Sequence, residues 1–178
     1  MHVTSAYAYP AMKDNNASQD RKPAGGPVRR GIGLPHRILV VDDDIYIREL
    51  STESLSLSGY QVDAAEDGDA AWQALNADAY DLLITDHIMP KVTGLELVRK
   101  LRAAHMAVPV ILATGIPPTD EFAQSPWLIP AATLLKPYTI AELLGTVKNV
   151  LHAYASDALR PELSADDPLP ARSAHLFS

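Results

Sequence analysis

Apolar and polar positions along the chain follow two different periods. Residues 38–41, 82–85 and 108–112 form mainly apolar runs of strand length. Such a run predicts a strand that is buried on both faces, as in a parallel sheet. Residues 61–65 predict a weaker strand, and Leu134-Leu135 ends the last one. The pattern therefore predicts five strands.

The first segment between strands carries a helical pattern. Ile45, Leu50, Leu55 and Leu57 are interpreted as the apolar stripe of an amphipathic helix. Gly59 follows as a residue that can adopt the left-handed conformation at a helix end. This spacing predicts a helix that covers one face of the sheet.

Polar residues mark the starts of further helices. Asp67 is expected to cap a helix around residues 70–75. Thr93 and Glu96 have the spacing of a capping box, in which hydroxyl and carboxylate each bind a free backbone N–H, and predict a helix to about residue 104. Thr139 and Glu142 repeat that spacing before the final helix.

The segment before the last strand is rich in proline. Pro117-Pro118 can open a helix, but Pro126 should end it, so the fourth helix is expected to be short, about residues 119–124. Trp127 and Leu128 are interpreted as filling the space that a longer helix would occupy.

Strands and helices alternate, which predicts an α/β fold with five βα units, a doubly wound parallel sheet and helices on both faces. Residues 37–154 form the expected domain. Residues 1–36 are expected to be a disordered leader and residues 155–178 a disordered tail, because both are rich in proline, glycine and polar residues without an apolar period.

Composition narrows the possible functions. The chain has 178 residues and no cysteine, which excludes thiol catalysis and cysteine-bound metal sites. Its net charge is −7, and residues 37–153 hold 8 basic and 16 acidic residues, which argues against nucleic-acid binding. No apolar run approaches the roughly 20 residues that span a bilayer, so we expect no membrane partner and a cytoplasmic location.

Chemistry-bearing residues follow the strands. Asp42-Asp43-Asp44, Asp86, Thr114 and Lys136-Pro137 each close an apolar run. In a doubly wound sheet these strand ends lie at one edge, where ligands bind. Asp44 alone is explained as a helix cap, and each other residue alone has a similar structural explanation.

The constellation points to phosphate chemistry. Clustered carboxylates repel one another unless a cation compensates, and Mg²⁺ favours carboxylates, a carbonyl and phosphate oxygens. Lys136 could neutralise a phosphoryl group, and Thr114 could donate a hydrogen bond to it. Asp86 is the best candidate nucleophile, because it stands alone while Asp42 and Asp43 can share the metal.

Four motifs with matching order resemble the receiver (CheY-like) domain of response regulators. They are residues 40–44, residues 84–90 with Gly94, residues 112–115 and residues 134–138. The resemblance covers about residues 37–154. It implies a flavodoxin-like fold with strand order 2-1-3-4-5, and a stand-alone phosphoprotein in a two-component or phosphorelay pathway.

The resemblance also implies a role for each residue of the acidic cluster. Asp86 would accept a phosphoryl group from the phosphohistidine of a sensor histidine kinase or phosphotransfer protein. Asp42, Asp43, Asp86 and the backbone carbonyl of Ile88 would hold Mg²⁺. The protein would assist its own phosphorylation and dephosphorylation without being an enzyme for another substrate.

Signalling residues follow from the same resemblance. Thr114 and Lys136 would contact the phosphoryl group, and the peptide bond before Pro137 would be cis. Output would pass through protein contacts, because the surface of the fourth helix, fifth strand and fifth helix rearranges. Thr133 stands where family members often carry an aromatic residue, so an aromatic rotamer switch is not expected.

Two alternatives stay open. A haloacid-dehalogenase-like phosphatase would use Asp42 as nucleophile, but its later acidic pair could only be Asp166-Asp167 in the proline-rich tail, and Asp86 would have no role. A pseudo-receiver would bind partners without accepting phosphate. Labelling of wild type and Asp86→Asn would separate both from the receiver hypothesis.

Overall fold

The computed structural model describes residues 35–158, so most of the expected leader and tail lies outside the described residues. None of the helices in this range combines the length and apolar character needed to cross a bilayer. In chain order the elements are β1 (Arg37–Val41), α1 (Ile45–Leu57), β2 (Gln61–Ala65), α2 (Gly68–Ala77), β3 (Leu82–Asp86), α3 (Gly94–Ala103), β4 (Val110–Thr114), α4 (Thr119–Gln124), the 3₁₀ turn η1 (Pro126–Leu128), β5 (Ala132–Leu135) and α5 (Ile140–Ala158).

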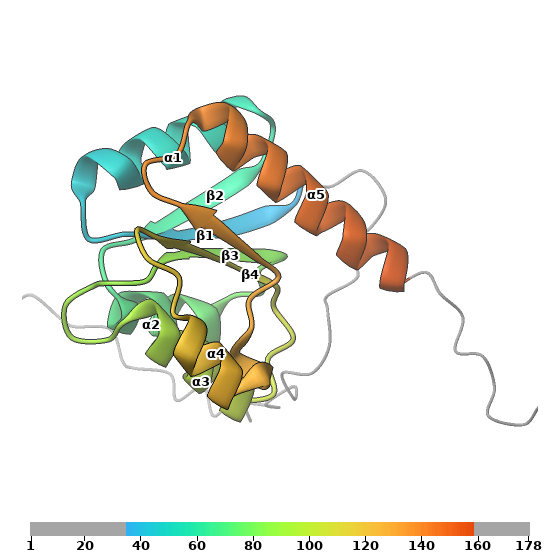
Figure 1. Cartoon of the computed structure of the whole chain (residues 1–178). Helices are drawn as coiled ribbons and strands as arrows, with labels where there is room; N and C mark the ends of the chain where they lie inside the picture. Colours follow the sequence, from blue (N-terminus) through green and yellow to red (C-terminus); the bar gives the residue numbers. More distant parts are fainter. Residues whose placement is uncertain (1–34, 159–178) are drawn as a thin grey trace, which may run out of the picture.

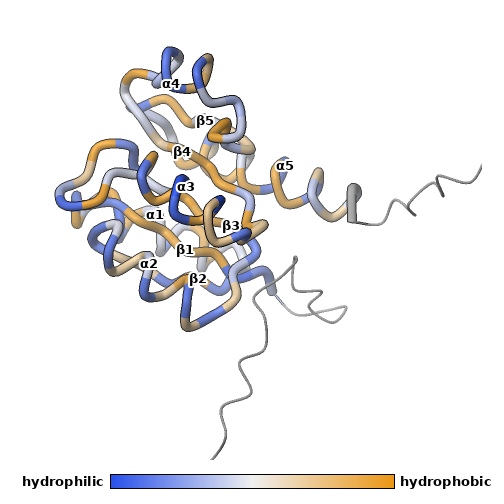
Figure 2. Tube along the Cα trace, turned by 90° about the horizontal axis from the view of Figure 1, so that it is seen from below, coloured by the Kyte–Doolittle hydropathy of each residue, from blue (hydrophilic) through white to orange (hydrophobic). Residues whose placement is uncertain are grey.

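The five strands form one parallel sheet in the order β2-β1-β3-β4-β5. This confirms the doubly wound α/β fold and its predicted strand order. All residues of β3 and β4 are buried, as their apolar runs predicted, whereas the edge strands β2 and β5 are only partly buried. Hydropathy follows the same division, with hydrophobic residues along the central strands β1 and β4 (Figure 2).

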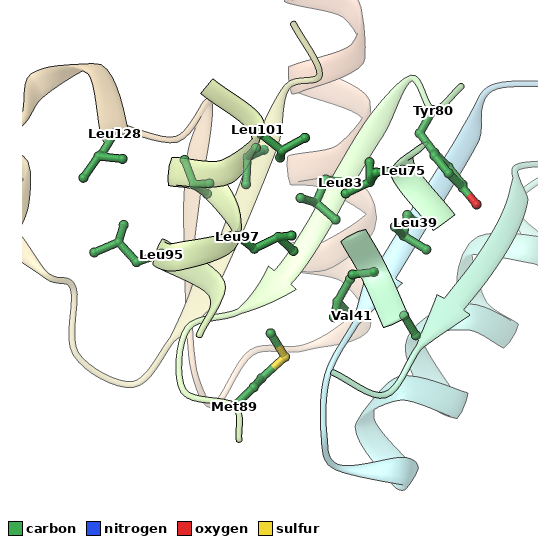
Figure 3. Close-up of a cluster of buried hydrophobic side chains, with 14 residues drawn as sticks. Leu39, Val41, Leu75, Tyr80, Leu83, Met89, Leu95, Leu97, Leu101 and Leu128 are labelled. Atoms are coloured by element: carbon green, nitrogen blue, oxygen red, sulfur yellow. The ribbon is translucent and has the colours of Figure 1, made fainter. Parts of the chain in front are cut away.

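Helices cover both faces of the sheet. α1 and α5 lie on one face, and α2, α3 and α4 lie on the other (Figure 1). Alternate residues of β1 serve the two layers: Ile38 and Val40 pack in the cluster that includes α5, while Leu39 and Val41 pack in the cluster that includes α2 and α3. Figure 3 shows this second cluster.

The predicted helix caps are confirmed. The Asp44 carboxylate accepts hydrogen bonds at the start of α1, and that of Asp67 does so at the start of α2. Thr93 and Glu96 form a reciprocal capping box before α3. Thr139 and Glu142 form the same pair before α5, with the Thr139 N–H donating to Glu142 at 2.7 Å. These caps fix where each helix begins after a strand end.

The apolar stripe expected on α1 was wrong. Ile45, Leu50 and Leu57 are exposed, whereas Ser51 and Leu55 are buried. Residues 51 and 55 are one helical turn apart and share a face, which the three exposed residues do not share with them. Gly59 ends α1 with a φ of 91°, as expected.

The fourth strand begins at Val110, two positions later than the apolar run suggested, and continues to Thr114. Pro109 has no N–H to contribute to a ladder, which explains the late start. α4 has the predicted bounds. Leu128 is fully buried in the cluster of Figure 3, but Trp127 is exposed, so only one of the two expected core residues fills the space.

Candidate functional site

The predicted strand-end residues meet at the carboxyl edge of the sheet. Asp42 follows β1 directly, and Asp86 is the last residue of β3. Thr114 ends β4, and its carbonyl accepts a hydrogen bond from the N–H of Lys136, the residue after β5, at 2.9 Å. Because neighbouring strands are parallel and in register, these residues share one edge although they are far apart in the sequence.

Lys136 links two of the carboxylates. Its Nζ lies 2.8 Å from Asp42 Oδ2 and 2.9 Å from Asp86 Oδ1. Both carboxylates are buried, and the amine is only slightly exposed. The peptide bond between Lys136 and Pro137 is cis. One ammonium group therefore stands between two buried acids.

This arrangement is not electrically balanced. Burial raises the pKa of Asp42, although the hydrogen bonds from Lys136 and from the Asp44 N–H act in the opposite direction. Burial alone would lower the pKa of Lys136, but its bonds to Asp42 and Asp86 outweigh it and raise the pKa. The amine stays charged, and the ionised form of Asp42 lacks full compensation.

A third carboxylate completes an acidic cluster. Asp43 is exposed, and one oxygen each from Asp42, Asp43 and Asp86 lie within 4.8 Å of one another. Ligands of an octahedral Mg²⁺ stand about 2.0–2.1 Å from the ion and therefore up to about 4 Å apart. Three hard oxygen donors, with one amine to offset their charge, fit that ion.

The hydroxyl group of Thr114 is fully occupied. It donates to the Ile116 carbonyl at 2.8 Å and accepts from the Ile116 N–H at 3.2 Å. The Nδ1 atom of His87 lies 3.1 Å from the same oxygen. The structure thus places Thr114 at the predicted edge, but its proton is directed to Ile116 rather than to Asp86.

The loop after Asp86 is held by close backbone contacts. A Cβ at Gly94 would stand 2.1 Å from the carbonyl oxygen of Asp86, so only glycine fits there. The Gly94 N–H also donates to the carbonyl of His87 at 3.0 Å. Ile88, whose carbonyl was predicted to be a metal ligand, lies in this loop with an exposed side chain.

A second contact joins this loop to the one before α2. The Lys91 ammonium donates to the buried carboxylate of Asp67. Hydrogen bonds from the Ala70 N–H and from Lys91 hold the pKa of Asp67 below its usual value. A Cβ at Gly68 would collide with Val92, which brings the two loops into direct contact.

Sequence reasoning missed three of these partners. For His87, its place directly after Asp86 was a usable signal. Nothing in the sequence indicated the partners of Lys91 and Arg48, because these depend on the directions of the loop and of the helix. Arg48 donates to the carbonyl of Asp42 at 2.6 Å. These side chains support the backbone around the acidic cluster.

A groove with mixed lining opens beside the cluster. It has a volume of about 330 Å³ and is lined by residues of two loops and of α4, namely His87, Ile88, Ile116, Pro117, Pro118, Thr119, Asp120 and Glu121. Ile88 and Ile116 are 74% and 81% exposed, which is high for large apolar side chains. The edge of the sheet therefore combines buried charge with an exposed apolar rim.

Comparison with known proteins identifies a family and relatives of this chain. Residues 38–148 match the family described as response regulator receiver domain. The chain is 35% identical over 124 residues to Response regulator MprA of Mycolicibacterium vanbaalenii, a match that covers 70% of this chain and 54% of that protein. The chain spans about half the length of the curated relatives it matches.

Solved structures give the same result. The chemotaxis response regulator CheY4 of Vibrio cholerae matches with a TM-score of 0.60 and 29% identity, covering 65% of this chain and 98% of that one. The response regulator protein TrrA of Thermotoga maritima, solved in complex with Mg(2+)-BeF, matches with a TM-score of 0.56 and 34% identity over 65% of this chain and 98% of that one.

Proposed function

Because this chain belongs to the response regulator receiver domain family of two-component systems, we propose that it accepts a phosphoryl group on Asp86. The donor would be the phosphohistidine of a sensor histidine kinase or phosphotransfer protein. An Oδ atom of Asp86 forms the new P–O bond while the P–N bond breaks, and the ring leaves as neutral imidazole when its other nitrogen carries a proton. The receiver domain is proposed to span residues 37–154.

The observation that carries this proposal is the position of the Lys136 amine. It lies 2.8 Å from Asp42 and 2.9 Å from Asp86, so it stands beside the proposed acceptor oxygen and can offset charge on an incoming phosphoryl group. Burial of Asp86 excludes most water from the same point. The haloacid-dehalogenase alternative would make Asp42 the nucleophile and leaves this arrangement around Asp86 without a purpose.

The acidic cluster is proposed to hold Mg²⁺. Asp42, Asp43, Asp86 and the carbonyl of Ile88 would be its protein ligands. When bound, the ion would neutralise the phosphoryl oxygens during transfer. Asp42 would gain from a cation, because burial raises its pKa and so penalises its charged form.

The rim of the site supports a protein donor. Ile45 and Tyr46 on α1, together with Ile88 and Ile116 in the loops, are large exposed side chains around the strand ends. Exposed apolar side chains beside a charged site suit contact with a protein that brings its phosphohistidine to that site. Output through the surface of α4, β5 and α5 is proposed as well.

Phosphate labelling tests the acceptor. The full chain is incubated with acetyl phosphate and Mg²⁺, and the adduct is located by mass spectrometry. We expect a base-labile adduct on Asp86, complete loss of it in Asp86→Asn, and loss without Mg²⁺. Asp63→Asn, whose carboxylate pairs with Arg37 rather than with Lys136, is the matched control and should be labelled like wild type. An unlabelled wild type, or a labelled Asp86→Asn, would contradict the proposal.

A further inference from the structure

The hydrogen bonds at Thr114 can be assigned by counting protons. A threonine hydroxyl has one hydrogen, and here it is given to the Ile116 carbonyl at 2.8 Å. The oxygen then accepts from the Ile116 N–H at 3.2 Å and from His87 Nδ1 at 3.1 Å. All three contacts are hydrogen bonds only when His87 carries a proton on Nδ1.

The imidazole of His87 stands on a fixed backbone. Its N–H donates to the carbonyl of Ala113 at 2.8 Å, and its carbonyl accepts from Gly94 at 3.0 Å. Asp86 pairs with Ala113 across β3 and β4, so His87 and Thr114 are the next residues along the backbone at these two strand ends. The bond between them joins the loop of the proposed acceptor to the residue that the resemblance expects to contact its phosphoryl group.

We propose that His87 is a positioning residue that holds the Thr114 hydroxyl toward Ile116 and away from Asp86. This inference rests on the proposed function of Asp86 and on the phosphoryl contact that the family resemblance implies for Thr114. To donate to a phosphoryl oxygen, Thr114 must withdraw its proton from Ile116 and rotate, which costs its present bond to His87. His87 therefore sets how strongly the resting state resists phosphorylation.

The same movement would reach the surface. His87 lines the groove beside the acidic cluster together with Ile88 and Ile116. Once Thr114 turns away, the imidazole loses its partner on the wall of this groove. The groove of the phosphorylated protein would then differ from that of the resting protein.

Beryllofluoride, which mimics a phosphoryl group on an aspartate, tests this role in the full chain. We expect His87→Leu to bind beryllofluoride with Mg²⁺ about threefold to tenfold more tightly than wild type, the gain from releasing about one hydrogen bond. Affinity for Mg²⁺ alone should stay unchanged, which a general distortion of the site would not allow. His87→Asn should behave like wild type, because its amide N–H can donate from the place of Nδ1.

Thr114→Val supplies the control background. There, His87→Leu should no longer alter beryllofluoride affinity, since no hydroxyl remains to be held. Thermal unfolding checks that each variant folds, and His87→Ala replaces His87→Leu if leucine does not fit. Unchanged or weaker binding by the folded variants, or a gain that persists without the Thr114 hydroxyl, would overturn the role of His87. A wild type that binds no beryllofluoride would instead contradict the proposed function itself.

Discussion

At the amino end of the sheet Arg37 bonds to three aspartates, whereas at the carboxyl end Lys136 bonds to two. The Arg37 Nε donates to Asp63 at 2.6 Å, and the guanidinium reaches Asp78 at 3.1 Å. The backbone N–H of Arg37 donates to Asp81 at 2.7 Å, and the guanidinium lies over the ring of Tyr80, 4.8 Å from its centre. The pKa of Arg37 is raised, mainly by its hydrogen bond to Asp78.

The two ends of the sheet differ mainly in how deeply the aspartate side chains are buried. The side chains of Asp63 and Asp78 are 37% and 50% exposed, and the planar guanidinium supplies several donors to them, whereas Asp81, at 14% exposed, accepts from the backbone N–H of Arg37. At the other end the side chains of Asp42 and Asp86 are 5% and 10% exposed and share a single ammonium group. Solvent and Arg37 can therefore compensate the charges of Asp63 and Asp78. The pair Asp42 and Asp86 keeps a net negative charge beside Lys136, which suits a divalent cation.

A substitution at Gly94 should have the largest effect, and it should affect the carboxyl end of the sheet alone. In Gly94→Ala the new methyl group would collide with the Asp86 carbonyl, so we expect a loss of about 3 kcal/mol in the free energy of unfolding. Phosphate labelling of Asp86 should fall with it, because the end of β3 must move. Urea unfolding and acetyl phosphate labelling measure the two effects.

Gly145→Ala is the matched control for this substitution. Gly145 lies in α5 with open space around its Cβ position. Alanine should therefore stabilise the protein by about 0.5–1 kcal/mol and leave labelling unchanged. Equal losses in the two variants would show that the close contact at Gly94 has no special importance.

Removing the two basic side chains tests whether the ends differ in purpose. Lys136→Met leaves two buried carboxylates without their amine, and we expect it to lower the free energy of unfolding by about 1–2 kcal/mol and phosphate labelling by about 100-fold. Arg37→Met should lower stability by about 1 kcal/mol but leave labelling at the wild-type rate. If Arg37→Met slows labelling as much as Lys136→Met, the two ends are not functionally distinct.

Neutralising Asp42 should give the smallest effect, and one of opposite sign. Its pKa is raised above the ordinary value of 3.8, so the folded protein holds this proton more tightly than the unfolded chain. The resulting stability is complete below pH 3.8 and is lost as pH rises through the higher, folded-state pKa. Without Mg²⁺ at pH 7, Asp42→Asn should therefore be more stable than wild type, by up to about 1 kcal/mol.

This gain should shrink as the pH falls toward 4, which urea unfolding in EDTA can follow. Added Mg²⁺ should stabilise wild type more than the variant and so reverse their order. Asp63→Asn serves as the comparison at the other end and should lose a little stability, because Arg37 loses a partner. A constant difference between Asp42→Asn and wild type at every pH would refute the assignment to Asp42 ionisation.

The fold was predictable where local chemistry and burial agree. Asp44, Asp67 and Thr93 cap helices through bonds to residues two or three positions away, so their function is visible in the sequence alone. α1 was misread because its buried face carries Ser51. Ser51 is buried there although it is polar, so an apolar period cannot reveal this face.

The acidic cluster was predictable for a topological reason. Parallel strands end at one edge, so Asp42, Asp86 and Lys136 had to lie near one another once the strands were recognised. The bond between His87 and Thr114 was not, because it depends on the direction of each side chain after its strand ends. Lys91 is a similar case, since it reaches Asp67 from a backbone position with a φ of 65°.

Asp42 and Lys136 are separated by 94 positions, and with Asp86 they draw on three strands, of which β5 is the edge strand and the last to be synthesised. A nascent or incompletely folded chain that has not yet docked β5 lacks the Lys136 amine beside the proposed acceptor, Asp86. Under the proposed function, Asp86 would therefore accept a phosphoryl group efficiently only after the whole domain has folded. Misfolded or unfinished chains would then not compete for the phosphoryl donor.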